Sequence, residues 1–397
     1  MISRLQVPVF QSSDGERSAT WLELFFDLVF VVAVAALSYR LEHQFDWGGV
    51  GLLMIYLLPV WWLWMELSYY GDLFDDNSTT YQLLMVAAMG GVMFMALALQ
   101  SDDYLSSRVY TFTYLFLAGV ALAMYLRAYV SFPSLQWFTR RFIGCIALSM
   151  GCWAVSLFVE GPYRYLLWLL GIVIQAAASP SIYLFRQDYP VQPSHMPERF
   201  GLFTIIVLGE GIAALTAASQ AEAFSAEVTK FTLGGFALTV CLWKLYFYES
   251  SKDTITEQLK QPGTRSLLMS FFYGYSHYFL YTSVIVIGAT ILVLIESTAA
   301  GHHYPALAME MLHGGCILYL MAITLIHWAA PASLFGSVMV ARFVVVVFSG
   351  CLLLLDFGEL AELYIQVGLF SGLIFVEYRI YRRKDAVPSS EQAEVGG

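Results

Sequence analysis

Charged residues are scarce in this sequence: Asp, Glu, Lys and Arg together make up 13% of its 397 residues. A soluble domain carries about 25%, so the composition excludes an ordinary soluble protein. The 20 basic residues form no patch of the kind that binds nucleic acid, and no nucleic-acid partner is expected. Walker, dinucleotide-binding, serine-hydrolase and zinc-protease motifs are also missing, which argues against nucleotide hydrolysis as an energy source in this chain.

Cysteine is rare as well, and its placement argues against a disulfide scaffold. The five cysteines all fall inside apolar runs, where a thiol packs as a small hydrophobic side chain. No cysteine or histidine pair has the spacing of metal ligands within one helix. The sequence therefore predicts no metal and no cofactor, and it leaves a proton or a monovalent cation as the coupling species to consider.

Long apolar runs are what the sequence has in abundance. Hydrophobic residues make up 59% of the chain, and the mean hydropathy is +0.66. Runs of about 20 apolar residues can cross a hydrocarbon core about 30 Å thick, and they lack the alternation of barrel strands. The sequence predicts an all-α integral membrane protein with twelve transmembrane helices, at 20–40, 48–70, 80–99, 108–130, 139–158, 163–185, 200–218, 227–249, 266–295, 306–330, 337–356 and 360–381.

The positions of the basic residues predict the orientation of these helices. If the N-terminus is cytoplasmic, fifteen of the 20 Lys and Arg residues lie on the cytoplasmic side. The exceptions are Arg40, Arg108, Arg164 and Lys230 on the opposite side, and Lys244 inside a predicted helix. Cytoplasmic loops are enriched in Lys and Arg, so both termini are predicted to be cytoplasmic.

Two stretches of the chain are similar at a single offset. Phe25–Leu37 resembles Phe203–Leu215, and the same shift of 178 positions places Glu66 on Lys244. Unrelated apolar helices can also look alike, but agreement at one offset favours a duplication in parallel orientation. The predicted organisation is a cytoplasmic N-terminal segment, a first six-helix repeat, a cytoplasmic linker, a second six-helix repeat and a disordered cytoplasmic tail, at 1–19, 20–185, 186–199, 200–381 and 382–397.

Charged residues inside the predicted helices are the main candidates for function, because ionisable groups in lipid are costly unless they are paired or hydrated. Asp27 lies about 9 Å beyond Trp21, a candidate interface anchor. Glu66 and Lys244 are expected at a similar depth, near the cytoplasmic side. Together with Asp27 they would form a charged gate. The simpler alternative is a structural ion pair, or a lysine whose amino group reaches the interface.

Glu210 is the candidate ion or proton site. It lies near the middle of the predicted helix 200–218 between two glycines, which allow a ligand or a second backbone to approach closely. His277 lies in an aromatic-rich stretch. It either lines a cavity or is a histidine of the protein core with all its hydrogen bonds made. The aromatic residues crowded into 48–70, Trp64 among them, are mostly expected in the interface belt.

The segment Thr20–Phe30, TWLELFFDLVF, resembles the opening signature of the bacterial low temperature requirement A family. The segment His195–Glu210 is similar to the second signature of that family, in the expected order. The resemblance covers most of the chain and implies a multi-pass protein of the bacterial inner membrane, without an agreed biochemical activity. The motif positions that it marks here are Glu23, Asp27, His195, Glu198, Arg199 and Glu210. From the residues alone, Glu23 can equally be an acidic residue in the first turn of a helix, where the helix dipole stabilises its negative charge.

Three functions are compatible with these features. The first is a secondary transporter or channel for a small solute or ion, with Glu210 as its ion or proton site and a charged cytoplasmic gate. The second is an intramembrane lipid-modifying enzyme in which His195 and Glu198 act beside Arg199, which would hold a phosphate. The third is a membrane sensor or assembly protein that does not transport. Charges inside the helices favour transport, with the lipid bilayer and an unknown solute as partners and with homo-oligomer formation left open.

Overall fold

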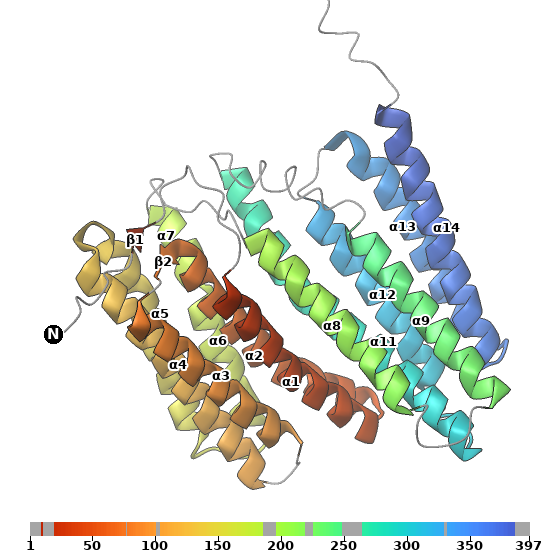
Figure 1. The fold of residues 1–397 in the computed structure, drawn as a ribbon, viewed down its shortest axis with the longest axis horizontal. Coiled ribbons are helices and arrows are strands. Elements are labelled where there is room, and N and C mark those ends of the chain that lie inside the picture. Colours follow the sequence, from red (N-terminus) through yellow and green to blue (C-terminus); the bar gives the residue numbers. More distant parts are fainter. Residues whose placement is uncertain are drawn as a thin grey trace, which may run out of the picture. The chain divides into compact units, whose positions relative to one another are not determined.

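The structure is a computed structural model, and it describes residues 9–10, 20–76, 78–100, 104–185, 196–218, 225–247, 264–328 and 332–385. Nearly all of this part of the chain is helical (Figure 1). The only strands among the described residues are β1 (Val9–Phe10) and β2 (Phe74–Asp75), which pair in antiparallel orientation. The prediction of an all-α protein is therefore confirmed.

The chain divides into two compact units, residues 1–210 (unit 1) and residues 211–397 (unit 2). Unit 1 contains α1 (Trp21–His43), α2 (Trp47–Leu73), α3 (Thr79–Leu99), α4 (Tyr104–Ser131), η1 (Pro133–Leu135), α5 (Gln136–Ser156), α6 (Pro162–Ala176) and α7 (Ala178–Phe185). Helix α8 (Met196–Ala218) contains the boundary. Unit 2 continues with α9 (Ala226–Phe247), α11 (Thr264–Ala300), α12 (Ala308–His327), α13 (Ala332–Leu352) and α14 (Glu359–Asp385).

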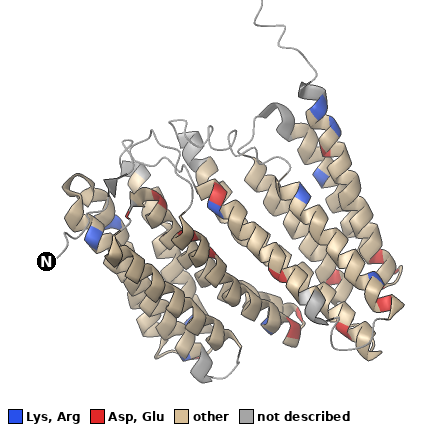
Figure 2. Cartoon of the chain, viewed as in Figure 1, with Lys and Arg blue, Asp and Glu red and all other residues tan. Residues whose placement is uncertain are grey.

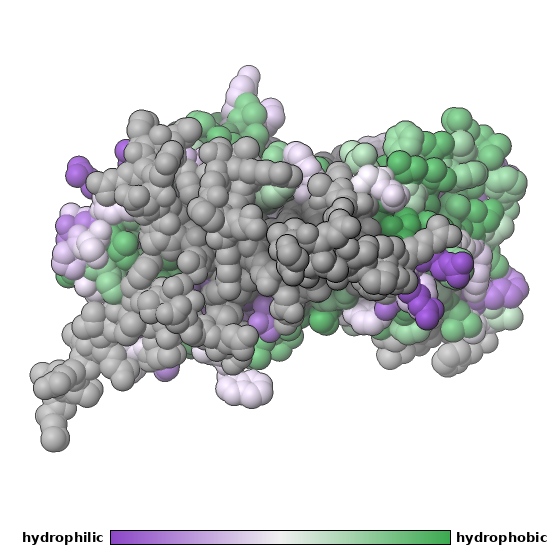
Figure 3. All heavy atoms as spheres, turned by 90° about the horizontal axis from the view of Figure 1, so that it is seen from above, coloured by the Kyte–Doolittle hydropathy of each residue, from purple (hydrophilic) through white to green (hydrophobic). Residues whose placement is uncertain are grey.

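Nine helices in the described part of the chain are long and apolar enough to cross a membrane. Many of their exposed side chains are large and hydrophobic, for example Leu83, Phe94 and Leu97 on α3. Figure 3 shows hydrophobic residues at the surface, and Figure 2 shows how few charged residues the helices carry. Lipid, rather than water, is the solvent for such a surface, so the chain is a membrane protein with several spanning helices.

Helices occupy all the ranges in which membrane spans are predicted. The range 163–185 holds two of them, α6 and α7, because the helix is interrupted at Ala177. Helix α8 begins at Met196, inside the predicted linker 186–199, and the boundary between the two units lies within α8. Since nine of the described helices satisfy the criteria of length and composition, a total of twelve crossings stays a prediction.

Local sequence determines where α1 and α3 begin. Thr20 caps α1, because its hydroxyl accepts from the backbone N–H of Glu23 while the Glu23 carboxylate accepts from the backbone N–H of Thr20 at 2.8 Å. Ser78 caps α3 by accepting from the N–H of Tyr81 at 3.2 Å. These two first turns lie beside the C-terminal end of α2, since Glu23 and Tyr81 both approach Gly71.

Aromatic side chains fill much of the interior of unit 1. Trp153 stacks on Tyr114 and on Trp168, with ring centroids 3.6 and 4.8 Å apart. The Tyr114 hydroxyl donates to Gln175 at 2.7 Å. Trp64 and its neighbouring tryptophans on α2 are buried as well, so the expectation that they lie in the interface belt is wrong. The buried indole of Trp64 finds a hydrogen-bond partner inside the protein, which removes its need for an aqueous interface.

Unit 2 is built around α11 and α12, which pack along their length, while α13 and α14 pack on each other and α9 packs on α11 and α14. Gly315 of α12 permits the close approach of α11, because a Cβ atom there would lie 2.8 Å from the side chain of Ile287. The interior of this unit contains polar groups as well as apolar ones. Arg342 on α13 binds Glu377 on α14 at 2.8 Å, and both side chains are buried.

Candidate functional site at the start of helices α1 and α8

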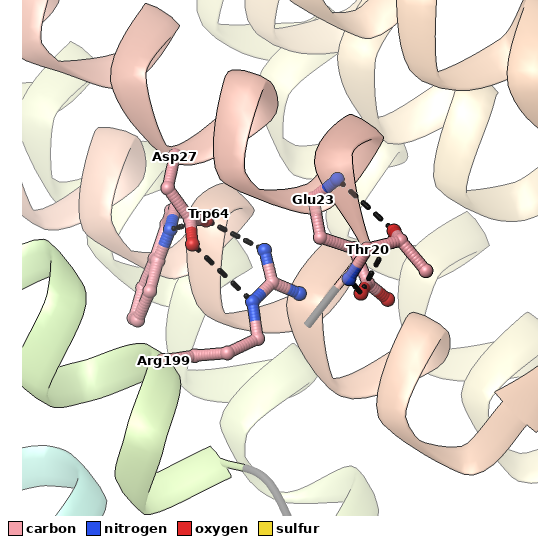
Figure 4. A network of polar contacts seen from close by, with 5 residues as sticks. All are labelled: Thr20, Glu23, Asp27, Trp64 and Arg199. Carbon is pink, nitrogen blue, oxygen red and sulfur yellow. Dashed lines mark hydrogen bonds and ion pairs between the residues drawn. The ribbon is translucent and has the colours of Figure 1, made fainter. Parts of the chain in front are cut away.

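A buried ion pair joins the first helix of the chain to α8. The Nη2 atom of Arg199 lies 2.6 Å from Oδ1 of Asp27, and its Nε lies 3.4 Å from Oδ2. The side chains are 3% and 1% exposed, respectively. Trp64 of α2 donates a third hydrogen bond, from its indole Nε1 to Oδ1 of Asp27, at 2.8 Å (Figure 4). Three helices therefore converge on one carboxylate.

Aromatic rings shield this ion pair from solvent. The indole of Trp64 stacks on Phe203 with ring centroids 4.4 Å apart, and it meets Phe200 edge to face at 5.2 Å. The guanidinium carbon of Arg199 lies 5.8 Å from the ring centroid of Phe26. A low-dielectric surrounding strengthens the attraction between the two charges, and it also makes either charge expensive if its partner is removed.

A second carboxylate lies close to the same arginine. Glu23 completes the cap of α1 with its Oε2 atom (Figure 4), and its Oε1 would lie 3.2 Å from a Cβ atom on Gly71. The same Cβ position would be 2.8 Å from the Tyr81 hydroxyl and 3.9 Å from Nη1 of Arg199. We call Thr20, Glu23, Asp27, Trp64 and Arg199 the Asp27 cluster. Only glycine at position 71 leaves room for these polar groups to meet.

The Asp27 cluster is not fully satisfied. The Nη1 atom of Arg199 is buried and has no hydrogen-bond partner among the described residues. The cluster also holds two carboxylates, of Glu23 and Asp27, against one guanidinium. The guanidinium of Arg199 can therefore accommodate one more acceptor besides Asp27.

The family model described as bacterial low temperature requirement A protein matches residues 18–375, nearly the whole chain. The chain belongs to this family. An uncharacterised protein of Rhizobium meliloti (strain 1021) is 25% identical to it over 329 residues, covering 78% of this chain and 77% of the relative. No solved structure matches the chain.

Three of the residues that the sequence resemblance marks come together in space: Glu23, Asp27 and Arg199. A fourth, Glu198, is in the first turn of α8 and is partly exposed. His195, which the sequence also marks, lies outside the described residues. Because Asp27 and Trp64 surround Arg199 in its buried position, the arginine can hold a lipid phosphate only if this pair opens.

Glu66 is buried in unit 1, but in surroundings different from those of Asp27. Its carboxylate interacts electrostatically with the Tyr114 hydroxyl on α4 and with Cys145 on α5. One of its oxygens, Oε2, has no hydrogen-bond partner among the described residues. The charged gate predicted from Asp27, Glu66 and Lys244 thus has its first member bound to Arg199, a residue that the sequence marked as a motif position and as a candidate phosphate ligand, but not as a member of the gate.

The other predicted residues occupy separate places. Glu210 is half-buried at the end of unit 1, and a Cβ atom on Gly209 or on Gly211 would meet nothing within 4 Å. Lys244 is partly buried on α9, with its Nζ atom 5.9 Å from the ring centroid of Trp243. His277 is fully buried on α11, where Nδ1 lies 2.7 Å from the Tyr273 carbonyl oxygen.

Sequence reasoning missed the polar pairs of unit 2. Arg342 binds Glu377, and His313 binds Glu362 at 2.9 Å, all four side chains being buried. The first pair joins the consecutive helices α13 and α14, and the second joins α12 to α14. Arg342 and Glu377 could have been identified from the sequence as Asp27 was, because each is a charged residue within an apolar helix.

Proposed function

We propose that this protein is a secondary transporter or channel for a small solute or ion, with the Asp27 cluster as the charged element of its gate. The observation that carries the proposal is the buried pair between Asp27 and Arg199, because it joins the two signature segments of the family. Ionisable residues buried in membrane helices most often mark pathways for ions, protons or substrates.

Stability alone does not account for such a pair. Removing two charges from water costs several kcal/mol per ion, and apolar residues of similar volume are often equally stabilising or more so. The excess carboxylate and the unpartnered Nη1 of Arg199 further favour a pair that opens. In the proposed gate, Asp27 and Arg199 separate when water or a solute enters, and Glu23 becomes the alternative partner of the guanidinium.

We retain Glu210 as the proposed ion or proton site, with Glu66 and Lys244 as further members of the charged pathway. Glu210 is supported by its half-buried carboxylate and by the open space beside the flanking glycines, Gly209 and Gly211. Glycines next to a carboxylate allow a hydrated ion to approach without obstruction by neighbouring side chains.

Two parallel six-helix repeats belong to the same proposal. Helices α5 and α13 each contain 21 residues, and they are followed by α6 and α14, respectively. In each unit these successive helices pack on one another, and α6 packs on α2 as α14 packs on α9. Parallel repeats are a common architecture of transporters. The distribution of basic residues places both termini in the cytoplasm of the proposed arrangement.

A flux assay with stability-matched variants tests the gate. The full-length protein is reconstituted into vesicles loaded with a pH-sensitive dye, and proton and potassium fluxes are driven by imposed gradients. The double variant Asp27→Leu with Arg199→Met is expected to remain folded, because it removes both charges together, but to lose gated flux. Arg342→Met with Glu377→Leu is the matched control, which removes a buried pair outside the Asp27 cluster and is expected to keep flux.

The same assay tests the remaining pathway residues. Glu210→Gln and Lys244→Met are expected to reduce flux, whereas Lys230→Met, on the exposed surface of the same helix α9, is expected to leave it unchanged. Flux that is identical in all these variants and in the double variant at Asp27 and Arg199 would reject the proposed pathway. Loss of flux only in unfolded variants would also count against it.

A further inference from the structure

Three helices of unit 2 share a second buried polar site, which the proposed gate does not include. It consists of His313 on α12, Ser349 on α13, and Glu362 and Gln366 on α14. All four residues are at most 2% exposed. Every described contact that builds the site lies within unit 2, so its geometry is independent of the Asp27 cluster.

The imidazole of His313 faces two acceptors. Its Nε2 lies 2.9 Å from Oε2 of Glu362, and its Nδ1 lies 3.2 Å from Oε1 of Gln366. A neutral imidazole has one N–H donor and one acceptor nitrogen, whereas the protonated ring has two donors. The observed partners therefore suit a His313 ring that carries a proton on both nitrogens, paired with an ionised Glu362.

The carboxyl group of Glu362 is held in position by its own helix. Its Oε1 accepts from the backbone N–H of Phe357 at 3.0 Å, and the residue lies in the first turn of α14. The N-terminus of a helix carries a partial positive charge that favours a carboxylate there. The anion is thus fixed on one side by the backbone and on the other by His313.

The side-chain amide of Gln366 can adopt two orientations, as a site that binds and releases a proton requires. Its Nε2 donates to the Ser349 hydroxyl at 3.0 Å, while that hydroxyl lies 3.2 Å from Oε1 of the same amide. A hydroxyl both donates and accepts, so it remains bonded if the amide turns over. The turned amide would present an N–H to Nδ1 of His313, and this suits the neutral ring.

His277 is a structural histidine of the same unit and serves as a comparison for His313. Its Nδ1 lies 2.7 Å from the Tyr273 carbonyl oxygen, and its Nε2 lies 2.8 Å from the Tyr246 hydroxyl, which can donate. One N–H donor and one acceptor nitrogen satisfy both contacts, so His277 is bonded fully as a neutral ring. His313 differs because, in the described part of the chain, the contacts of its two nitrogens are to side-chain oxygens of Glu362 and Gln366.

The helices packed against His313 carry other titratable or charged groups, but the hydrogen bonds described for its ring are those to Glu362 and Gln366. On α11, Glu296 is exposed and His277 is bound as described; on α13, Arg342 is bound to Glu377 of α14. Glu359 lies in the first turn of α14 beside Glu362. On α12 itself Glu310 is exposed, and Cys316 is buried near Gln366. Among the described residues, Glu362 is accordingly the carboxylate that directly contacts the ring.

We propose that His313, Glu362 and Gln366 form a proton-binding site in unit 2. When the site is occupied, the proton makes the imidazole a donor to both Glu362 and Gln366. When the proton leaves to water, the Gln366 amide turns and donates to Nδ1. Binding of the proton follows from this geometry alone, whereas its use to drive solute movement rests on the proposed function.

Histidine NMR on the intact protein tests the site directly. The full-length protein is labelled with ring-¹⁵N histidine and studied in detergent micelles at about pH 8, roughly 1.5 units above the ordinary pKa of histidine. We expect one of the seven imidazoles to carry protons on both nitrogens. This signal should disappear in His313→Gln, become that of a neutral ring in Glu362→Gln, and persist in His277→Gln.

The outcomes separate this inference from the transport proposal. Absence of a doubly protonated imidazole in the wild-type protein at that pH, or its persistence in His313→Gln, overturns the proton site. If His313→Gln does not fold, the wild-type spectrum and Glu362→Gln still decide. A doubly protonated His313 in a protein without any flux upholds the site and rejects transport. Flux driven by a pH gradient and unchanged in Glu362→Gln overturns the coupling role.

Discussion

Asp27 and Arg199 are 172 positions apart in the sequence, yet Nη2 of Arg199 lies 2.6 Å from Oδ1 of Asp27. Both side chains are buried, and Trp64 donates to the same carboxylate oxygen. The contact connects the second turn of α1 to the first turn of α8 and brings together the two segments on which the sequence resemblance rests. Several properties of the protein are expected to depend on it.

Removing one partner of this pair is expected to destabilise the protein strongly. Asp27→Leu leaves the guanidinium of Arg199 buried without a counter-charge, and such a loss costs about 3–5 kcal/mol. Adding Arg199→Met removes the unpaired positive charge, so the double variant is expected to recover most of the lost unfolding free energy. Unfolding by denaturant in detergent measures both values. If the double variant is less stable than Asp27→Leu, the two residues are not coupled as described.

The indole N–H of Trp64 is expected to contribute through Asp27. Trp64→Phe keeps an aromatic ring against Phe203 but removes the donor at 2.8 Å. Losing a hydrogen bond to a charged group costs about 1.5–3 kcal/mol, in addition to the smaller ring. Combined with Asp27→Leu, the same substitution should cost distinctly less. An exposed tryptophan, Trp47, provides the control, and Trp47→Phe should change the free energy of unfolding little.

Two glycines of α2 are expected to respond in opposite directions to alanine. At Gly71 the new Cβ atom would lie 2.8 Å from the Tyr81 hydroxyl and 3.2 Å from Oε1 of Glu23. Crowding of this kind costs about 1–3 kcal/mol. At Gly51 the Cβ atom would meet nothing within 4 Å, and Gly51→Ala should stabilise the helix by about 0.5–1 kcal/mol. Thermal unfolding of the two variants decides whether the polar groups converge at Gly71.

Glu66 is expected to behave differently from Asp27, although both are buried acids of unit 1. Glu66→Gln keeps the shape of the side chain while removing an ionisable group that is buried with Oε2 unpartnered among the described residues. Its thermal unfolding midpoint should therefore be equal to or above that of the wild type. Asp27→Asn, which weakens the bonds to Arg199, should lower the midpoint. A clear loss of stability in Glu66→Gln would reveal a counter-charge that stabilises the carboxylate.

The ion pair of unit 2 should depend on the shape of its cation. Arg342 binds Glu377 through Nε at 2.8 Å and through Nη2 at 3.2 Å. Lysine keeps the charge but cannot make both bonds, because the ammonium group lacks the planar fork of the guanidinium. Arg342→Lys is expected to lose about 1.5–3 kcal/mol of unfolding free energy. Lys230→Arg, on the exposed surface of α9, serves as the control and should change little.

The positions of the helices could be predicted from the sequence because lipid imposes one solution on a long apolar run. With no water to satisfy backbone groups, each run must form a helix, and helices do occupy the predicted ranges. The interruption at Ala177 is not shown by apolar composition, which continues through this position.

The chain by itself determined the membrane class, the family and the residues in which charge is costly, because hydropathy and local motifs are properties of short segments. Only the tertiary structure decided which charges meet. Asp27 is bound by Arg199 and Trp64, and His313 by Glu362 and Gln366, since side chains far apart in sequence become neighbours only when helices pack. Partner choice is set by the rotation of each helix about its axis, which hundreds of weak packing contacts fix together.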